Sequence, residues 1–139
     1  MQNTYNLGID IGSTTVKTVV MNEKDELIYT EYKRHFSKVR ESVCEQLSAI
    51  RSKFGKDREY KLAITGSAGL GIANSAELPF VQEVFAAFIA VQNRYDDIDV
   101  VIELGGEDAK IIFLTGGVEQ RMNGSCAGGT GAFIDQMAT

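Results

Sequence analysis

One pattern constrains the fold more than any other, and it occurs twice in the sequence. It is a strand-like segment that ends in an acidic residue and a glycine turn. The first copy runs from Gly8 to Lys17 and the second from Val101 to Lys110. In each copy an apolar segment leads to an acid, then to one or two glycines and a polar turn, and then to a second strand-like segment. Strand segments joined by so short a link pair antiparallel. The pattern therefore predicts two β-hairpins with polar, glycine-bearing turns.

The segments around these hairpins predict an α/β chain with a mixed sheet. A helix is expected from an N-cap at Ser37 to a stop at Gly55, and a second helix is expected to open at Pro79 and to end near Tyr95. A third helix begins near Gly131, after a glycine-rich loop. Strands are expected at residues 5–10, 15–21, 27–35, 61–65, 99–104, 109–114 and 118–122.

Composition narrows the class of protein. The 139 residues are 44% apolar, which is enough for the core of one domain, and the net charge of −5 argues against a nucleic-acid partner. The longest apolar runs are strand-sized, and the N-terminus carries no signal-peptide pattern, so no membrane segment is expected. Two cysteines do not make a disulfide scaffold. A reducing, cytoplasmic location is therefore expected.

The first hairpin carries groups suited to binding a phosphate. The glycine at position 12 lets backbone N–H groups approach an anion closely, and Ser13, Thr14 and Thr15 add hydroxyl donors. Asp10, at the strand end, is placed to hold water on a phosphate-bound Mg²⁺. The alternative is an ordinary hairpin with a polar turn. A P-loop is excluded because no Gly-Lys-Ser/Thr ending is present.

The second hairpin repeats this chemistry with Glu103 as its acid, followed by Gly105, Gly106 and Glu107. Two such hairpins in one domain could contact one polyphosphate from two sides, each supplying backbone donors and an acid for metal or water. The alternative is a glycine-rich hairpin with solvated acids. The recurrence of the pattern favours the phosphate-binding interpretation.

Together the two hairpins resemble the phosphate-binding loops of the actin, hexokinase and heat-shock-chaperone ATPase fold. The resemblance implies an α/β, ribonuclease-H-like lobe that carries both loops, with a mixed central sheet, helices on its faces, and ATP in a cleft between two lobes. Residues 1–139 are then expected to be a single N-terminal ATPase lobe, and a fragment of a longer chain, because the last helix has no C-terminal stop signal. The expected nucleotide-binding residues are Gly12, Ser13, Thr14, Thr15, Lys17, Gly105, Gly106 and Asp108.

A third motif narrows the family. The stretch Met122–Phe133 contains the run Cys-Ala-Gly-Gly-Thr-Gly and resembles the cluster loop of the BadF/BadG/BcrA/BcrD-type ATPases. These include the activators of 2-hydroxyacyl-CoA dehydratases and the ATPase subunits of benzoyl-CoA reductase. The resemblance implies an ATPase that passes a low-potential electron to a CoA-ester dehydratase or reductase. ATP, Mg²⁺ and a [4Fe–4S] cluster are the expected cofactors, and Asp10, Glu103 and Glu107 are the expected catalytic residues.

Cys126 is the expected cluster ligand. A cysteine among glycines at a helix N-terminus is biased toward the thiolate, the form that binds iron. A [4Fe–4S] cluster takes four thiolates, and in the family two subunits supply two cysteines each. The resemblance therefore implies a homodimer or a tandem pseudo-dimer, with a second ligand after Thr139. The alternative is a metal-free cysteine in a nucleotide-binding turn.

The chain also departs from the short activators. They usually carry Asp at the position of Glu103 and Gln at that of Glu107, and a Cys-His pair often stands where this chain has Val84–Phe88. These features are closer to the long, fused activase-like proteins, which carry related ATPase lobes in tandem. The departures leave open whether Glu103 and Glu107 replace the usual acid and amide.

Four further sites complete the expectations. Cys44 is expected to pack on the apolar side of its helix, and His35 to lie on the surface. Glu83 faces either the nucleotide cleft or solvent. The stretch Gly66–Gly69 is either a loop on the nucleotide side or a tight strand-to-helix turn.

Two other functions fit the same fold. A small-molecule kinase, such as a sugar kinase, would transfer phosphate to a hydroxyl group, and an actin-like or chaperone-like ATP switch would bind partners without iron. Neither needs the Cys-Ala-Gly-Gly-Thr-Gly loop, so this loop favours the activase. The electron acceptor, the adenine pocket and the oligomeric state are left open.

Overall fold

The computed structural model describes residues 4–117, 119–123 and 130–138. The chain divides into two compact units, residues 1–81 and residues 82–139. The described strands form two separate sheets, one in each unit. Each glycine hairpin lies in its own unit.

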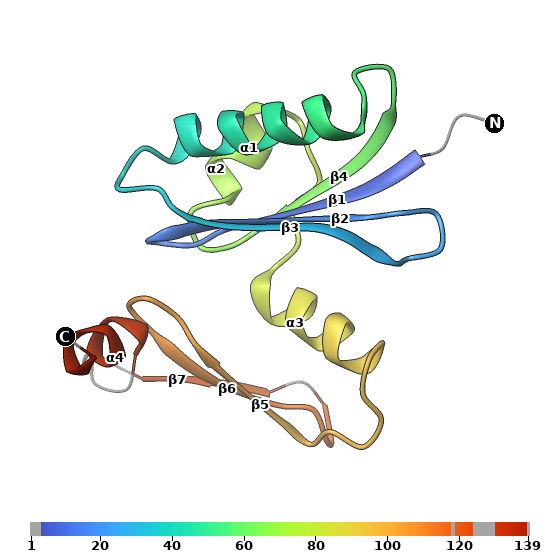
Figure 1. Cartoon of the computed structure of the whole chain (residues 1–139). Helices are drawn as coiled ribbons and strands as arrows, with labels where there is room; N and C mark the ends of the chain where they lie inside the picture. The colour runs from blue at the N-terminus through green and yellow to red at the C-terminus, as the bar shows by residue number, and fades with distance from the viewer. Residues whose placement is uncertain (1–3, 118, 124–129, 139) are drawn as a thin grey trace. The chain divides into compact units, whose positions relative to one another are not determined.

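Unit 1 is a four-stranded mixed sheet with two helices (Figure 1). The strand order is β3-β2-β1-β4, in which β1, β2 and β3 pair antiparallel and β4 runs parallel to β1. Both helices lie over the same face of this sheet. Its elements are β1 (Thr4–Ile11), β2 (Thr15–Met21), β3 (Leu27–Arg34), α1 (Val39–Phe54), β4 (Glu59–Thr65) and α2 (Leu70–Ser75).

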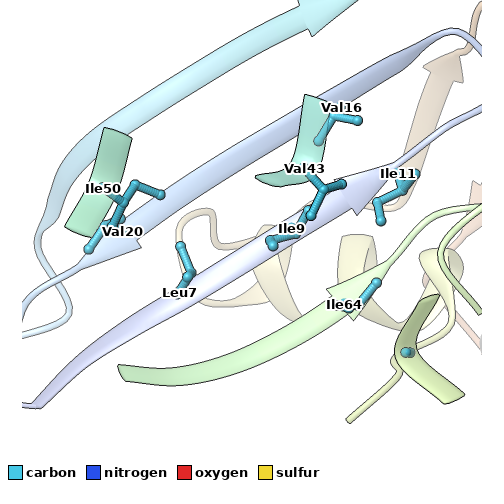
Figure 2. Close-up of a cluster of buried hydrophobic side chains, with 9 residues drawn as sticks. Leu7, Ile9, Ile11, Val16, Val20, Val43, Ile50 and Ile64 are labelled. Carbon is cyan, nitrogen blue, oxygen red and sulfur yellow. The ribbon is translucent and has the colours of Figure 1, made fainter. Parts of the chain in front are cut away.

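The core of unit 1 lies between this sheet face and the helices. Leu7, Ile9 and Ile11 alternate along β1 and are at most 4% exposed. Figure 2 shows Val43 and Ile50 of α1 pointing toward the buried side chains of β1 and β2. Each such buried side chain contributes about 1.5–3 kcal/mol relative to exposure. Because strand side chains alternate, the intervening residues of β1, including Asp10, lie on the opposite face.

Unit 2 is a three-stranded antiparallel sheet with a helix before it and a helix after it (Figure 1). The strand order is β5-β6-β7. Its elements are α3 (Glu83–Gln92), β5 (Val100–Leu104), β6 (Ala109–Phe113), β7 (Glu119–Met122) and α4 (Gly131–Met137). No helix among the described residues is long and apolar enough to cross a membrane.

Two helix boundaries differ from the sequence expectation. Helix α3 begins at Glu83 and not at Pro79, because the segment before it pairs with β4: the Val81 N–H donates to the Ile64 carbonyl at 2.8 Å, and the Ile64 N–H donates to the Pro79 carbonyl at 2.9 Å. Helix α1 takes Lys38 as its N-cap. Ser37 has a left-handed backbone, with φ of 63°.

The environment of one cysteine also differs from the sequence expectation. Cys44 is exposed, not packed. Ser42, Val43, Gln46 and Ile50 form the buried stripe of α1, and Cys44 falls beside that stripe because each residue turns the helix by about 100°. The helix also tolerates a buried amide there, since Gln46 donates to the Val16 carbonyl at 3.3 Å.

Candidate functional site

The hairpin of unit 1 pairs its acid directly with a lysine on the next strand. Asp10 and Lys17 are cross-strand partners in the β1–β2 register. Lys17 Nζ lies 2.8 Å from Asp10 Oδ2, and both side chains are partly exposed, 44% for the lysine and 29% for the aspartate. Both expected site residues therefore lie together at one end of the sheet, on the face opposite the core.

The turn between these strands leaves backbone donors available. The Gly12 N–H donates to the Thr15 carbonyl at 2.9 Å and closes the turn. Among the described residues, no acceptor takes the N–H groups of Ser13 or Thr14. Ser13 is exposed, whereas Thr15 is buried at 6% exposure. Of the expected donors, Ser13 and Thr14 therefore remain accessible, whereas the Thr15 side chain is buried.

The loop after β4 lies against the same turn. The Ala68 N–H donates to the Ile11 carbonyl at 2.9 Å. Gly66 has φ of 99°, and a Cβ atom there would lie 2.3 Å from the Ile11 carbonyl oxygen. Only glycine permits this approach. Gly66–Gly69 therefore lies beside the first hairpin and leads into α2, which confirms the tight strand-to-helix turn.

His35 is buried at 5% exposure and contacts the hairpin, which corrects the expectation of a surface position. Its Nε2 lies 3.2 Å from the Gly12 carbonyl oxygen, and its backbone N–H donates to the Thr14 carbonyl at 3.1 Å. The sequence pattern missed this residue because it follows a polar strand end. No periodicity signals a side chain that folds back over a turn.

The hairpin of unit 2 has the same local construction. Glu103 and Lys110 are cross-strand partners, as Asp10 and Lys17 are, with the same separation of seven residues. The Gly105 N–H donates to the Asp108 carbonyl at 2.8 Å. A Cβ atom on Gly105 would lie 2.2 Å from Asp108 Oδ1, so the aspartate side chain folds into the space that glycine leaves.

Lys110 is the centre of a cluster of three carboxylates in unit 2. Its Nζ lies 2.8 Å from Glu83, 3.1 Å from Asp108 and 3.5 Å from Glu103, and its side chain is 5% exposed. Burial alone lowers the pKa of Lys110, but hydrogen bonds to Glu83 and Asp108 and the charge of Glu103 outweigh it and raise the pKa above that of an ordinary lysine. The ion pair with Lys110 holds the Glu103 side chain in place. The Glu107 side chain is exposed to solvent.

The start of α4 adjoins the second hairpin. The Gly131 N–H donates to the Gly105 carbonyl at 2.7 Å. Thr130, the residue before the helix, is fully buried. The loop that carries Cys126 immediately precedes this point in the sequence, and Cys126 itself lies outside the described residues.

The first hairpin fits a phosphate with its Mg²⁺. Two adjacent N–H groups, for which the described part of the chain offers no acceptor, suit phosphate oxygens, and a partly exposed carboxylate suits a water on the metal. In the described parts of the chain, no group of three or more His, Cys, Asp or Glu side chains is arranged to hold a metal ion. A Mg²⁺ that takes most of its ligands from phosphate and water needs no such group.

The sequence also resembles known proteins across most of its length. The model of the BadF/BadG/BcrA/BcrD ATPase family matches residues 7–139. The (R)-2-hydroxyglutaryl-CoA dehydratase activating ATPase of Acidaminococcus fermentans is 30% identical over 139 residues, which cover 96% of this chain and 52% of that protein. The chain spans about half the length of the curated relatives it matches.

Two solved structures share the fold. The (R)-2-hydroxyglutaryl-CoA dehydratase component A of Acidaminococcus fermentans matches with a TM-score of 0.77 at 26% identity, covering 97% of this chain and 53% of that one. The activator of the 2-hydroxyisocaproyl-CoA dehydratase from Clostridium difficile, with bound ADPNP, matches with a TM-score of 0.76 at 28% identity, covering 96% and 51%. These matches confirm the predicted actin- and hexokinase-like ATPase fold.

Proposed function

The chain belongs to the BadF/BadG/BcrA/BcrD ATPase family, and from this premise we propose that it forms the phosphate-binding part of an ATP-hydrolysing activator of a CoA-ester dehydratase or reductase. The observation that carries the proposal is the duplicated hairpin, in which an acid, a glycine turn and a lysine seven residues after the acid recur in both units. Relatives named as dehydratase activators support the choice of partner.

In this proposal the first hairpin binds ATP phosphate through the N–H groups of Ser13 and Thr14, and Gly12 keeps the turn close to the anion. Lys17 adds positive charge beside Asp10. Asp10 would hold Mg²⁺ through water, and the metal would supply charge neutralisation at the phosphates. A solved relative with bound ADPNP supports nucleotide binding by this fold.

The second hairpin contributes acids for the attacking water. Glu103 is held by Lys110, and a carboxylate with a fixed position is suited to orient a water molecule. Glu107, in the same turn, is the second candidate for this role. Gly105 closes the turn through its bond to the Asp108 carbonyl, and Gly106 and Asp108 supply backbone donors. ATP hydrolysis would then change the conformation of the protein around the iron–sulfur cluster.

The redox half of the proposal rests on Cys126. One cysteine supplies one of the four thiolates of a [4Fe–4S] cluster. We assign the remaining ligands to a later cysteine of the full-length chain and to a second copy or repeat, as a homodimer or a tandem pseudo-dimer. When bound, the cluster supplies a low-potential electron for the dehydratase or reductase.

The experiment is anaerobic cluster reconstitution of the full-length protein, with Cys126→Ser and a matched Cys44→Ser control. Cys44 is exposed on α1, so its replacement should leave the cluster intact. The expected result is charge-transfer absorption of a [4Fe–4S] cluster in the parent and in Cys44→Ser, with loss or strong reduction in Cys126→Ser. Absence of this absorption in the parent, with ATP hydrolysis retained, would leave a kinase or a cluster-free ATP switch as the function.

A further inference from the structure

We propose that His35 is a positioning residue of the β1–β2 hairpin, which holds the turn in the form that binds phosphate. This inference rests on the proposed function of that hairpin. His35 is the first residue after β3, and it is 5% exposed although it follows a strand of largely exposed side chains. The burial is specific to this side chain, since Phe36 beside it is 78% exposed.

The His35 ring and its backbone N–H make three hydrogen bonds to the surrounding chain. Its Nε2 lies 3.2 Å from the Gly12 carbonyl oxygen, and its backbone N–H donates to the Thr14 carbonyl at 3.1 Å. On the other side of the ring, the Ser37 N–H donates to Nδ1 at 3.1 Å. Since Nδ1 accepts a hydrogen bond, the ring is assigned as the neutral tautomer with its proton on Nε2.

The two hydrogen bonds from His35 to the turn occupy carbonyl oxygens that would otherwise repel an anion. Carbonyl oxygens carry partial negative charge, and a turn that binds phosphate must direct its N–H groups outward and its carbonyls elsewhere. The His35 ring bonds to the Gly12 carbonyl, and the His35 backbone N–H bonds to the Thr14 carbonyl. Between those carbonyls lie the N–H groups of Ser13 and Thr14, for which no acceptor exists among the described residues. His35 thus fixes the polarity of the turn without facing the ligand.

The backbone after His35 keeps the ring in this position. Phe36 and Ser37 both have left-handed backbones, with φ of 47° and 63°, a conformation that non-glycine residues adopt rarely and at a conformational cost. The Lys38 N–H closes this segment by donating to the His35 carbonyl at 2.7 Å. The reversal turns the Ser37 N–H toward the ring, so the imidazole is fixed from both sides.

Two substitutions separate the two bonds of the ring. In His35→Gln the terminal amide nitrogen is as many bonds from Cα as Nε2, so it retains the donor to Gly12. In His35→Asn the side chain reaches only as far as Nδ1, so it retains the acceptor for Ser37 and loses the donor. Tyr60→Phe is the matched control, because it also removes one side-chain bond to a backbone carbonyl of unit 1, from Tyr60 Oη to Gly55 at 3.2 Å.

The measurement is the affinity of the full-length protein and its variants for Mg-ATP and for adenosine, with thermal unfolding recorded alongside. His35→Asn should weaken ATP binding by about 3- to 10-fold, the range expected for one lost hydrogen bond, and should leave adenosine binding unchanged. His35→Gln should retain most of the ATP affinity, and Tyr60→Phe all of it. This selective loss is a result that a general structural role would not produce.

The contrary outcomes are distinct. If the parent binds no ATP, the proposed function itself fails. If the parent binds ATP and His35→Asn binds it equally well, the positioning role is wrong. Equal losses for ATP and adenosine, or failure of both His35 variants to fold, would make His35 a general stabilising residue and would also overturn the proposal.

Discussion

At the scale of single residues, Gly66 is the glycine that the fold of unit 1 can least replace. It has φ of 99°, and an added Cβ would lie 2.3 Å from the Ile11 carbonyl oxygen. We predict that Gly66→Ala lowers the free energy of unfolding by about 2–4 kcal/mol. Gly71 is the matched control, since a Cβ there meets no atom within 4 Å and its place in α2 favours alanine by about 1 kcal/mol. Urea unfolding that shows equal effects for the two would contradict this account.

The positive charge of Lys110 balances the carboxylates around it. Three carboxylates lie within 3.5 Å of its Nζ. We predict that Lys110→Met is less stable than the parent at pH 7 by about 1–3 kcal/mol, because the carboxylates lose their partner. Lys33→Met is the control: its ion pair with Glu45 is exposed to solvent, so the change in stability should be small.

The pH dependence of this difference follows from the raised pKa of Lys110. A folded-state pKa above the unfolded value gives stabilisation that is complete below the unfolded pKa, about 10.5 for lysine, and is lost as pH rises through the folded value. The difference in unfolding free energy between parent and Lys110→Met should therefore shrink above about pH 10.5. A difference that stays constant from pH 7 to alkaline pH would show that the ion cluster does not contribute.

Several residue roles could be predicted from sequence and others could not. The acids and glycines of both hairpins follow from strand and turn chemistry, and the structure pairs each acid with a lysine seven residues later. The burial of His35 was not predictable, because it depends on a left-handed reversal at Phe36 and Ser37 that no residue preference favours. The exposure of Cys44 was missed because Gln46 occupies the buried stripe.

At the scale of elements, α1 is held to its sheet by a buried polar contact as well as by apolar packing. Gln46 is 1% exposed and contacts the Thr18 hydroxyl, which is fully buried. We predict that Gln46→Leu alone destabilises unit 1 by about 1–3 kcal/mol, since the Thr18 hydroxyl loses its partner. Adding Thr18→Val should recover much of this loss, because an apolar pair leaves no buried group unsatisfied. Additive effects in a double-mutant cycle would contradict the coupling.

Element boundaries were predictable only where local signals decide them. The two glycine hairpins and the start of α4 at Gly131 follow the sequence pattern. The start of α3 does not, because Phe80 forms a parallel bridge with Ile64 and keeps the chain extended past Pro79. This pairing joins residues that are distant in sequence, and a local pattern contains no information about such a partner.

At the scale of the whole molecule, the hydrophobic core is unevenly divided. All nine residues of the buried core cluster belong to unit 1. We predict that residues 1–81 alone unfold in one cooperative urea transition, whereas residues 82–139 alone show none, because Ile112 is the one buried apolar residue among the described part of unit 2. The check is circular dichroism of the two fragments. A cooperative transition in the second fragment, or none in the first, would contradict this division.

The central claim is that the acid of the first hairpin serves ATP hydrolysis. The direct measurement is Mg-dependent ATP hydrolysis by the full-length protein, by Asp10→Asn, and by Asp25→Asn, which makes the same chemical change at an exposed position outside the hairpin. We predict hydrolysis by the parent and by Asp25→Asn, and a fall in kcat of about 100-fold or more in Asp10→Asn, because the metal loses its carboxylate. Unchanged kcat in Asp10→Asn, or no hydrolysis by the parent, would contradict the claim.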